Sequence, residues 1–160
     1  IAQCLVGSEM CIRDSHTAYL CERIASKLYM NAAAAKAGGY YHKIGVLQND
    51  NSYEAVEGIL AEYHMPGQAL QILKEYLQPD IPIRSRETVV LLFADTMISS
   101  ISYLFKKNKE AVLDYDKLVE AVFQKKLSSG ILNQSEISIG DLEQMKKILA
   151  GEQLYYDFLR

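Results

Sequence analysis

The stretch RETVVLLFADTMISSISYLFK, residues 86–106, decides the fold of this 160-residue chain. It follows a candidate N-cap, Ser85, and its long apolar character predicts a helix in a protein core. Serine and threonine side chains interrupt the apolar run, and its centre holds one carboxylate, Asp95. A central aspartate costs roughly 2.5–3.5 kcal/mol in lipid. We therefore expect a buried core helix and not a membrane span.

The segments on either side of this helix also have helical spacing. Apolar residues and alanines predict helices over residues 16–30, 32–41, 52–64, 66–76, 114–130 and 138–160. Expected caps and breaks lie at Ser52, Gly45, Pro79, Pro82 and the Ser138–Asp141 capping box. Gly38 and Gly39 weaken the second helix, which indicates close packing against a neighbour. We expect an all-α, compact bundle of about six or seven helices, forming one domain over residues 16–160.

The first fifteen residues differ from the rest. The stretch AQCLVGSEMCIRDS, residues 2–15, has no clear period and lacks the features of a signal peptide. It looks like translated sequencing-adapter sequence, and the chain opens on Ile1 like a fragment. We expect residues 1–15 to be a non-native or disordered N-terminal stretch, so that only Cys21 of the three cysteines belongs to the domain. The alternative is a genuine, poorly structured arm.

Composition excludes several classes of protein. The chain is 49% hydrophobic and 23% charged, which is typical of a globular domain. A net charge of −3 argues against binding to duplex DNA or RNA. The cysteines form no C-x-x-C pair or disulfide framework, which favours a reducing compartment. We expect a cytoplasmic location, with membrane attachment left to a longer parent protein.

Asp95 is the first candidate for chemistry. A carboxylate inside the most apolar helix must be paired, hydrogen-bonded or bound to a metal. His16 opens one predicted helix and His42 closes the next, and imidazole and carboxylate groups from separate helices bind divalent metals. A half-buried aspartate bonded to a hydroxyl or a lysine explains the same pattern. Both interpretations stay open at this point.

The order His16, YYHKIG at 40–45 and ADT at 94–96 resembles the HD superfamily of metal-dependent phosphohydrolases. More closely, it resembles the HDIG-type domains of cyclic-di-AMP phosphodiesterases in bacterial membrane receptors. The matching stretches are HTAYLCERIASKL (16–28), AKAGGYYHKIG (35–45), RETVVLLFADTMISSISYLF (86–105), KLVEAVFQKKLSSGIL (117–132) and DLEQMKKIL (141–149). The resemblance therefore covers residues 16–160.

The resemblance implies a metal site. In the family, a first-helix His, a His-Asp doublet and a later Asp hold a divalent metal, and metal-activated water attacks a phosphodiester. Carried over to this chain, the ligands are His16, His42 and Asp95. The implied cofactor is manganese, iron or magnesium, and the implied partner is a cyclic dinucleotide.

The sequence departs from the family at the doublet. Lys43 stands where the family has the doublet aspartate, and residues 74–80, KEYLQPD, lack the histidines expected for a second metal. His64 matches a non-ligand position. Either Lys43 swings to solvent and leaves a weak metal site, or its ammonium pairs with Asp95 in place of the metal, which we favour. Keeping the Lys43 ammonium 4 Å from a divalent metal ion costs about 8 kcal/mol at an effective dielectric constant of 20.

These observations predict an HD-type phosphohydrolase-related domain that acts on or binds a cyclic dinucleotide and is catalytically impaired. The alternative is a non-catalytic regulatory or nucleotide-binding module in which the Lys43–Asp95 pair replaces the metal. A purely structural helical domain is the third hypothesis.

Overall fold

The computed structural model describes residues 9–160; Cys4 and the side chain of Cys11 lie outside this description. Within residues 9–160 there are eight α-helices, two short 3-10 helices and no strand, so the predicted all-α class is confirmed. The elements are α1 (Glu9–Lys27), α2 (Ala32–Tyr41), η1 (Ile44–Gln48), α3 (Tyr53–Leu60), η2 (Ala61–Tyr63), α4 (Gly67–Leu77), α5 (Arg86–Lys107), α6 (Tyr115–Ser128), α7 (Ile139–Gly151) and α8 (Gln153–Asp157).

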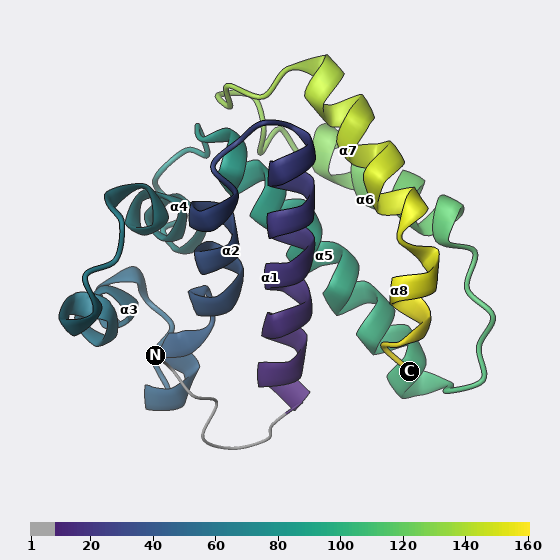
Figure 1. Cartoon of the computed structure of the whole chain (residues 1–160), viewed down its shortest axis with the longest axis horizontal. Coiled ribbons are helices and arrows are strands. Elements are labelled where there is room, and N and C mark those ends of the chain that lie inside the picture. Colours follow the sequence, from purple (N-terminus) through teal and green to yellow (C-terminus); the bar gives the residue numbers. More distant parts are fainter. Residues whose placement is uncertain (1–8) are drawn as a thin grey trace.

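Helix α5 crosses the molecule behind the α1–α2 pair (Figure 1). Helices α1 and α2 lie side by side, and both contact α5. Helix α4 packs on the outer side of α2, while α6 packs on α5 and α7 packs on α6. The arrangement brings the end of α2 and the middle of α5, which lie far apart in the sequence, into contact.

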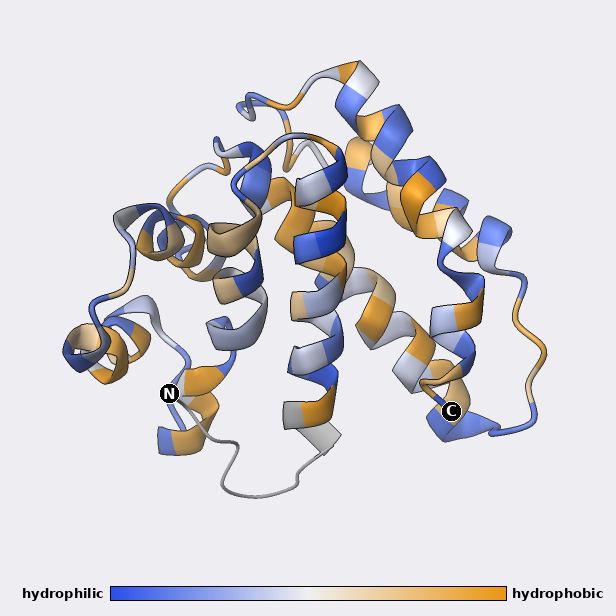
Figure 2. Cartoon of the chain, viewed as in Figure 1, coloured by the Kyte–Doolittle hydropathy of each residue, from blue (hydrophilic) through white to orange (hydrophobic). Residues whose placement is uncertain are grey.

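The core is built around α5, as the sequence predicts. Eight of its apolar side chains are fully buried: Val89, Val90, Leu91, Phe93, Ala94, Met97, Ile98 and Ile101. Complete burial of one large apolar side chain stabilises the fold by about 1.5–3 kcal/mol. Helix α5 is long and apolar enough to cross a membrane, but most of its apolar stretch is buried inside the protein. The hydrophobic colouring along α5 in Figure 2 therefore belongs to a core helix.

Helices α1 and α2 approach each other at a glycine. A methyl group on Gly39 would lie 2.6 Å from the Cα atom of Ala18, closer than any real side-chain contact. At Gly38 the same methyl would lie 2.9 Å from the Ile72 side chain on α4. Backbone contact at this distance requires a residue without Cβ. The close packing predicted from these glycines is confirmed.

The helix starts follow the expected caps with two differences. Ser52 and Ser138 accept bonds from the helix backbone, and Ser138 forms the predicted capping box with Asp141. Ser85 precedes α5 but makes no side-chain cap; its hydroxyl donates instead to Glu75. Helix α1 begins at Glu9, seven residues earlier than the sequence pattern indicated.

Candidate functional site

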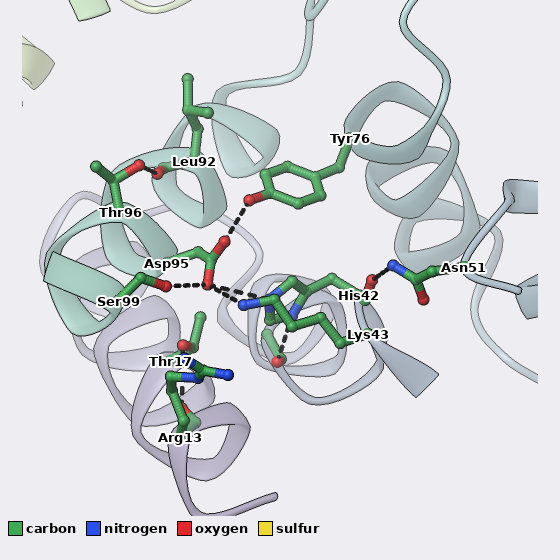
Figure 3. A network of polar contacts seen from close by, with 11 residues as sticks. Arg13, Thr17, His42, Lys43, Asn51, Tyr76, Leu92, Asp95, Thr96 and Ser99 are labelled. Atoms are coloured by element: carbon green, nitrogen blue, oxygen red, sulfur yellow. Dashed lines mark hydrogen bonds and ion pairs between the residues drawn. The ribbon is translucent and has the colours of Figure 1, made fainter. Parts of the chain in front are cut away.

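Asp95 lies at the centre of a polar cluster inside the bundle (Figure 3). Its Oδ1 accepts hydrogen bonds from Lys43 Nζ at 2.7 Å and from Ser99 Oγ at 3.2 Å. Its Oδ2 accepts a bond of 2.6 Å from the Tyr76 hydroxyl. The Nε2 atom of His42 lies 3.3 Å from Oδ1. Four side chains from α4, α5 and the end of α2 therefore converge on one carboxylate.

The turn after α2 places His42 and Lys43 side by side at this cluster. His42 caps α2, with its N–H bonded to the Gly38 carbonyl, and its own carbonyl accepts a bond from Asn51 Nδ2. A methyl group on Gly45 would lie 2.1 Å from the Asp50 carbonyl oxygen, so the chain can turn this tightly only at a glycine. The turn therefore holds Lys43 within reach of Asp95.

The His42 ring is oriented by its backbone. Its Nδ1 lies 2.8 Å from the Gly39 carbonyl oxygen, and since a carbonyl only accepts, Nδ1 must carry a proton. Nε2 then faces the Asp95 carboxylate at ion-pair distance without a well-aligned hydrogen bond.

Electrostatics keep Asp95 charged and Tyr76 neutral. Burial alone would raise the pKa of the Asp95 carboxyl, but His42 and Lys43 outweigh it and hold that pKa well below its usual range. Burial and the neighbouring carboxylate raise the pKa of the Tyr76 hydroxyl far above its ordinary value. Tyr76 therefore remains a hydrogen-bond donor to a permanent carboxylate.

Helix α1 contributes a residue that sequence reasoning missed. Asp14 is only 7% exposed, and its Oδ1 is buried without a hydrogen-bond partner. Burial raises the pKa of its carboxyl, opposed by His42 and Lys43 and reinforced by Asp95. Asp14 was overlooked because it lies in the stretch set apart as non-native. Its spacing to Cys21, seven residues along the same helix face, is the sequence signal that would have found it.

His16 faces another neighbour. Its Nδ1 pairs with the hydroxyl of Tyr155 on α8, and the two rings meet edge to face. Tyr19 stacks on the same tyrosine, with ring centroids 4.1 Å apart. Among the described residues His16 pairs with Tyr155 and not with His42 or Asp95.

With Lys43 bonded to Asp95, the residues present do not form a site for a divalent metal. Among the described residues, no group of three or more His, Cys, Asp or Glu side chains is arranged to hold one. Both oxygens of Asp95 are bonded, one of them to an ammonium. The metal set His16, His42 and Asp95 remains a prediction, whereas the predicted Lys43–Asp95 pair is confirmed.

Comparison with known proteins places the fold. No family model and no curated protein matches the sequence. Two solved structures of the HD domain of the L. monocytogenes phosphodiesterase PgpH are similar, with TM-scores of 0.71 and 0.70 and sequence identities of 13% and 15%. Each match covers 92% of this chain and 92% of the other, and the first structure is a complex with cyclic-di-AMP. The chain therefore has the fold of the PgpH HD domain, as its sequence resemblance to HD domains predicted.

Proposed function

We propose that this domain binds a cyclic dinucleotide of the cyclic-di-AMP type and is impaired in hydrolysing it. The ligand class is suggested by the sequence resemblance and by the cyclic-di-AMP bound to the PgpH domain of the same fold. The impairment rests on one observation, the contact of 2.7 Å between Lys43 Nζ and Asp95 Oδ1.

Lys43 supplies charge but not metal chemistry. A divalent metal lowers the pKa of a bound water and creates the nucleophile for phosphodiester hydrolysis. An ammonium donates hydrogen bonds and attracts phosphate, but it does not generate hydroxide at neutral pH. The Lys43 side chain is 22% exposed, so a phosphate can approach it from solvent. The cluster is therefore suited to holding a phosphodiester and poorly suited to cleaving one.

Residual hydrolysis is the second candidate function. The same exposure of Lys43 allows its flexible side chain to turn toward solvent, which leaves His42 and Asp95 facing each other. A weakly bound metal would then compete with the ammonium for Asp95.

The test compares three proteins: the wild type, Lys43→Asp and Lys36→Asp. Lys36 forms an exposed ion pair with Glu22 on the surface of α1 and α2. Lys36→Asp makes the same change of charge away from the cluster, so this variant is the matched control. Manganese binding is measured by calorimetry, and cyclic-di-AMP binding and hydrolysis are then measured with and without manganese.

We expect the wild type to bind the dinucleotide, to bind manganese weakly and to hydrolyse slowly or not at all. Lys43→Asp should gain manganese affinity, because the site loses a positive charge and gains a carboxylate ligand. Lys36→Asp should behave as the wild type does. Rapid manganese-dependent hydrolysis by the wild type refutes the impairment, and failure to bind cyclic-di-AMP refutes the ligand class.

A further inference from the structure

Residues 50–63, which include α3 and η2, form a satellite of the bundle. Helix α3 lies at the edge of the molecule and packs chiefly on η1, η2 and α4 (Figure 1). Its buried side chains belong to a small apolar cluster that is separate from the main core: Ile44, Tyr53, Val56, Leu60 and Leu73. A unit with few buried apolar contacts opens at a lower free energy than the core does. The segment is therefore a candidate for opening while the helices around α5 stay folded.

The segment is flanked by two residues in the left-handed region of backbone conformation. Asn49 ends η1 with a φ of 57°, and His64 ends η2 with a φ of 44°. Residues with a side chain rarely adopt this region, and only three described residues other than glycine do so. Hinges are a few positions at the ends of elements that absorb a change of φ and ψ. Asn49 and His64 therefore mark the two ends about which the segment can rotate.

The seam between the segment and the bundle leaves two acceptors unpaired. Asn51 Nδ2 donates to the His42 carbonyl at 2.9 Å, and Gln78 Nε2 donates to the Glu54 carboxylate at 2.9 Å. Because both partners only accept, each amide is fixed with its oxygen turned away. Asn51 Oδ1 and Gln78 Oε1 are buried, and neither has a donor among the described residues. Opening of the seam exposes both oxygens to water, which removes a penalty that the closed arrangement carries.

The same seam fastens the turn that carries Lys43. On one side of Lys43, the carbonyl of His42 accepts the bond from Asn51. On the other side, a methyl group on Gly45 would lie 2.8 Å from Asn51 Cα, and the Gly45 carbonyl accepts a bond of 3.0 Å from the Asp50 N–H. The segment therefore holds the residues on both sides of Lys43, and its separation from the bundle removes these restraints.

We propose that residues 50–63 are a lid that opens as a unit about Asn49 and His64, and that its opening releases Lys43 from Asp95. Once the turn is free, the ammonium can leave the carboxylate for solvent or for an anionic group of a ligand. The lid itself is independent of the ligand class. Its effect on binding deepens the proposed function and rests on it, because there Lys43 contacts the phosphodiester.

Hydrogen exchange of the full chain tests the lid. Val56 in the small cluster and Val119 in the main core are both fully buried, so Val56→Ala and Val119→Ala are matched variants that each remove two methyl groups. Exchange of the backbone amides is followed by NMR in the lid, over residues 53–60, and in α5, in buffer with chelator at pH 7.

We expect Val56→Ala to speed exchange in the lid about ten-fold, the ratio that two buried methyl groups give. Val119→Ala should speed exchange in α5 but leave the lid unchanged, because a lid that opens alone does not disturb the contacts of Val119. Equal acceleration of the lid and of α5 by Val119→Ala overturns the lid, since both would then exchange only through global unfolding.

Pulse acetylation with acetic anhydride tests the release of Lys43. Mass spectrometry compares Lys43 with Lys36, whose exposed pair with Glu22 lies outside the seam. Val56→Ala should raise acetylation of Lys43 relative to Lys36 about ten-fold, in step with exchange in the lid, and Val119→Ala should leave the ratio unchanged. A constant ratio in Val56→Ala, while exchange in the lid rises, overturns the release of Lys43.

Cyclic-di-AMP separates the lid from the ligand class. Its association rate with Val56→Ala should exceed the wild-type rate by the same factor as the acetylation of Lys43. An unchanged association rate overturns the effect of the lid on binding. Absence of binding by the wild type and both variants refutes the proposed ligand, while exchange and acetylation still decide the lid.

Discussion

Replacing Lys43 by methionine tests whether the ammonium holds the end of α2 to α5. The change leaves the Asp95 carboxylate, which is 14% exposed, without its closest cation. Breaking a fully buried ion pair in this way costs about 3–5 kcal/mol. The cost here is smaller because Lys43 is 22% exposed and Asp95 keeps the Tyr76 and Ser99 hydroxyl donors. We expect a loss of about 2 kcal/mol in the free energy of unfolding.

A loss of this size lowers the midpoint of thermal unfolding by about 4–8 °C in a domain of this length. The assay is thermal and urea unfolding in buffer with chelator at pH 7. Lys36→Met, which breaks the exposed pair with Glu22, should cost less than about 1 kcal/mol. The double variant Lys43→Met/Asp95→Asn should recover most of the loss, because no unpaired charge then remains.

The effect of Lys43 should depend on pH in a defined direction. The folded-state pKa of Asp95 is lowered, despite burial, by His42 and Lys43, so its stabilising contribution is fully present above the unfolded value of about 3.9. The contribution is lost as the pH falls through the folded value. The difference between wild type and Lys43→Met should therefore be largest near neutral pH and shrink below about pH 4. Equal stability of the two proteins at pH 7 would refute the structural role of the pair.

Two further changes test the packing of α1. Gly39→Ala should lower the free energy of unfolding by about 3 kcal/mol, because the added methyl group meets the Ala18 backbone. Gly58→Ala should raise the free energy of unfolding by up to about 1 kcal/mol, because its methyl group meets nothing within 4 Å. Urea unfolding measures both changes. A chain starting at Glu9 should keep the wild-type midpoint, while one starting at His16 should unfold at a lower temperature because it loses the first turns of α1. If the chain starting at His16 had the same midpoint of thermal unfolding as the wild type, residues 1–15 would be dispensable for stability.

Local sequence was sufficient to predict where the helices lie. Their positions follow from spacing and caps, which depend on residues three or four apart. Ser138 and Asp141 predicted the start of α7 because both partners of a capping box lie within one turn. The start of α1 was placed too late because residues 9–15 lack an apolar period, although they extend the helix.

The sequence also identified Asp95 as a buried carboxylate that needs a partner, and a pair with Lys43 was the favoured of two alternatives. Tertiary structure decided the rest, because periodicity does not specify which way a helix is rotated against its neighbours. The rotation of α1 turns Asp14 toward the cluster and His16 toward Tyr155. Tyr76 reaches Asp95 only because α4 ends beside the middle of α5. Contacts of this kind join residues distant in sequence, and packing of the whole bundle is what sets their distances.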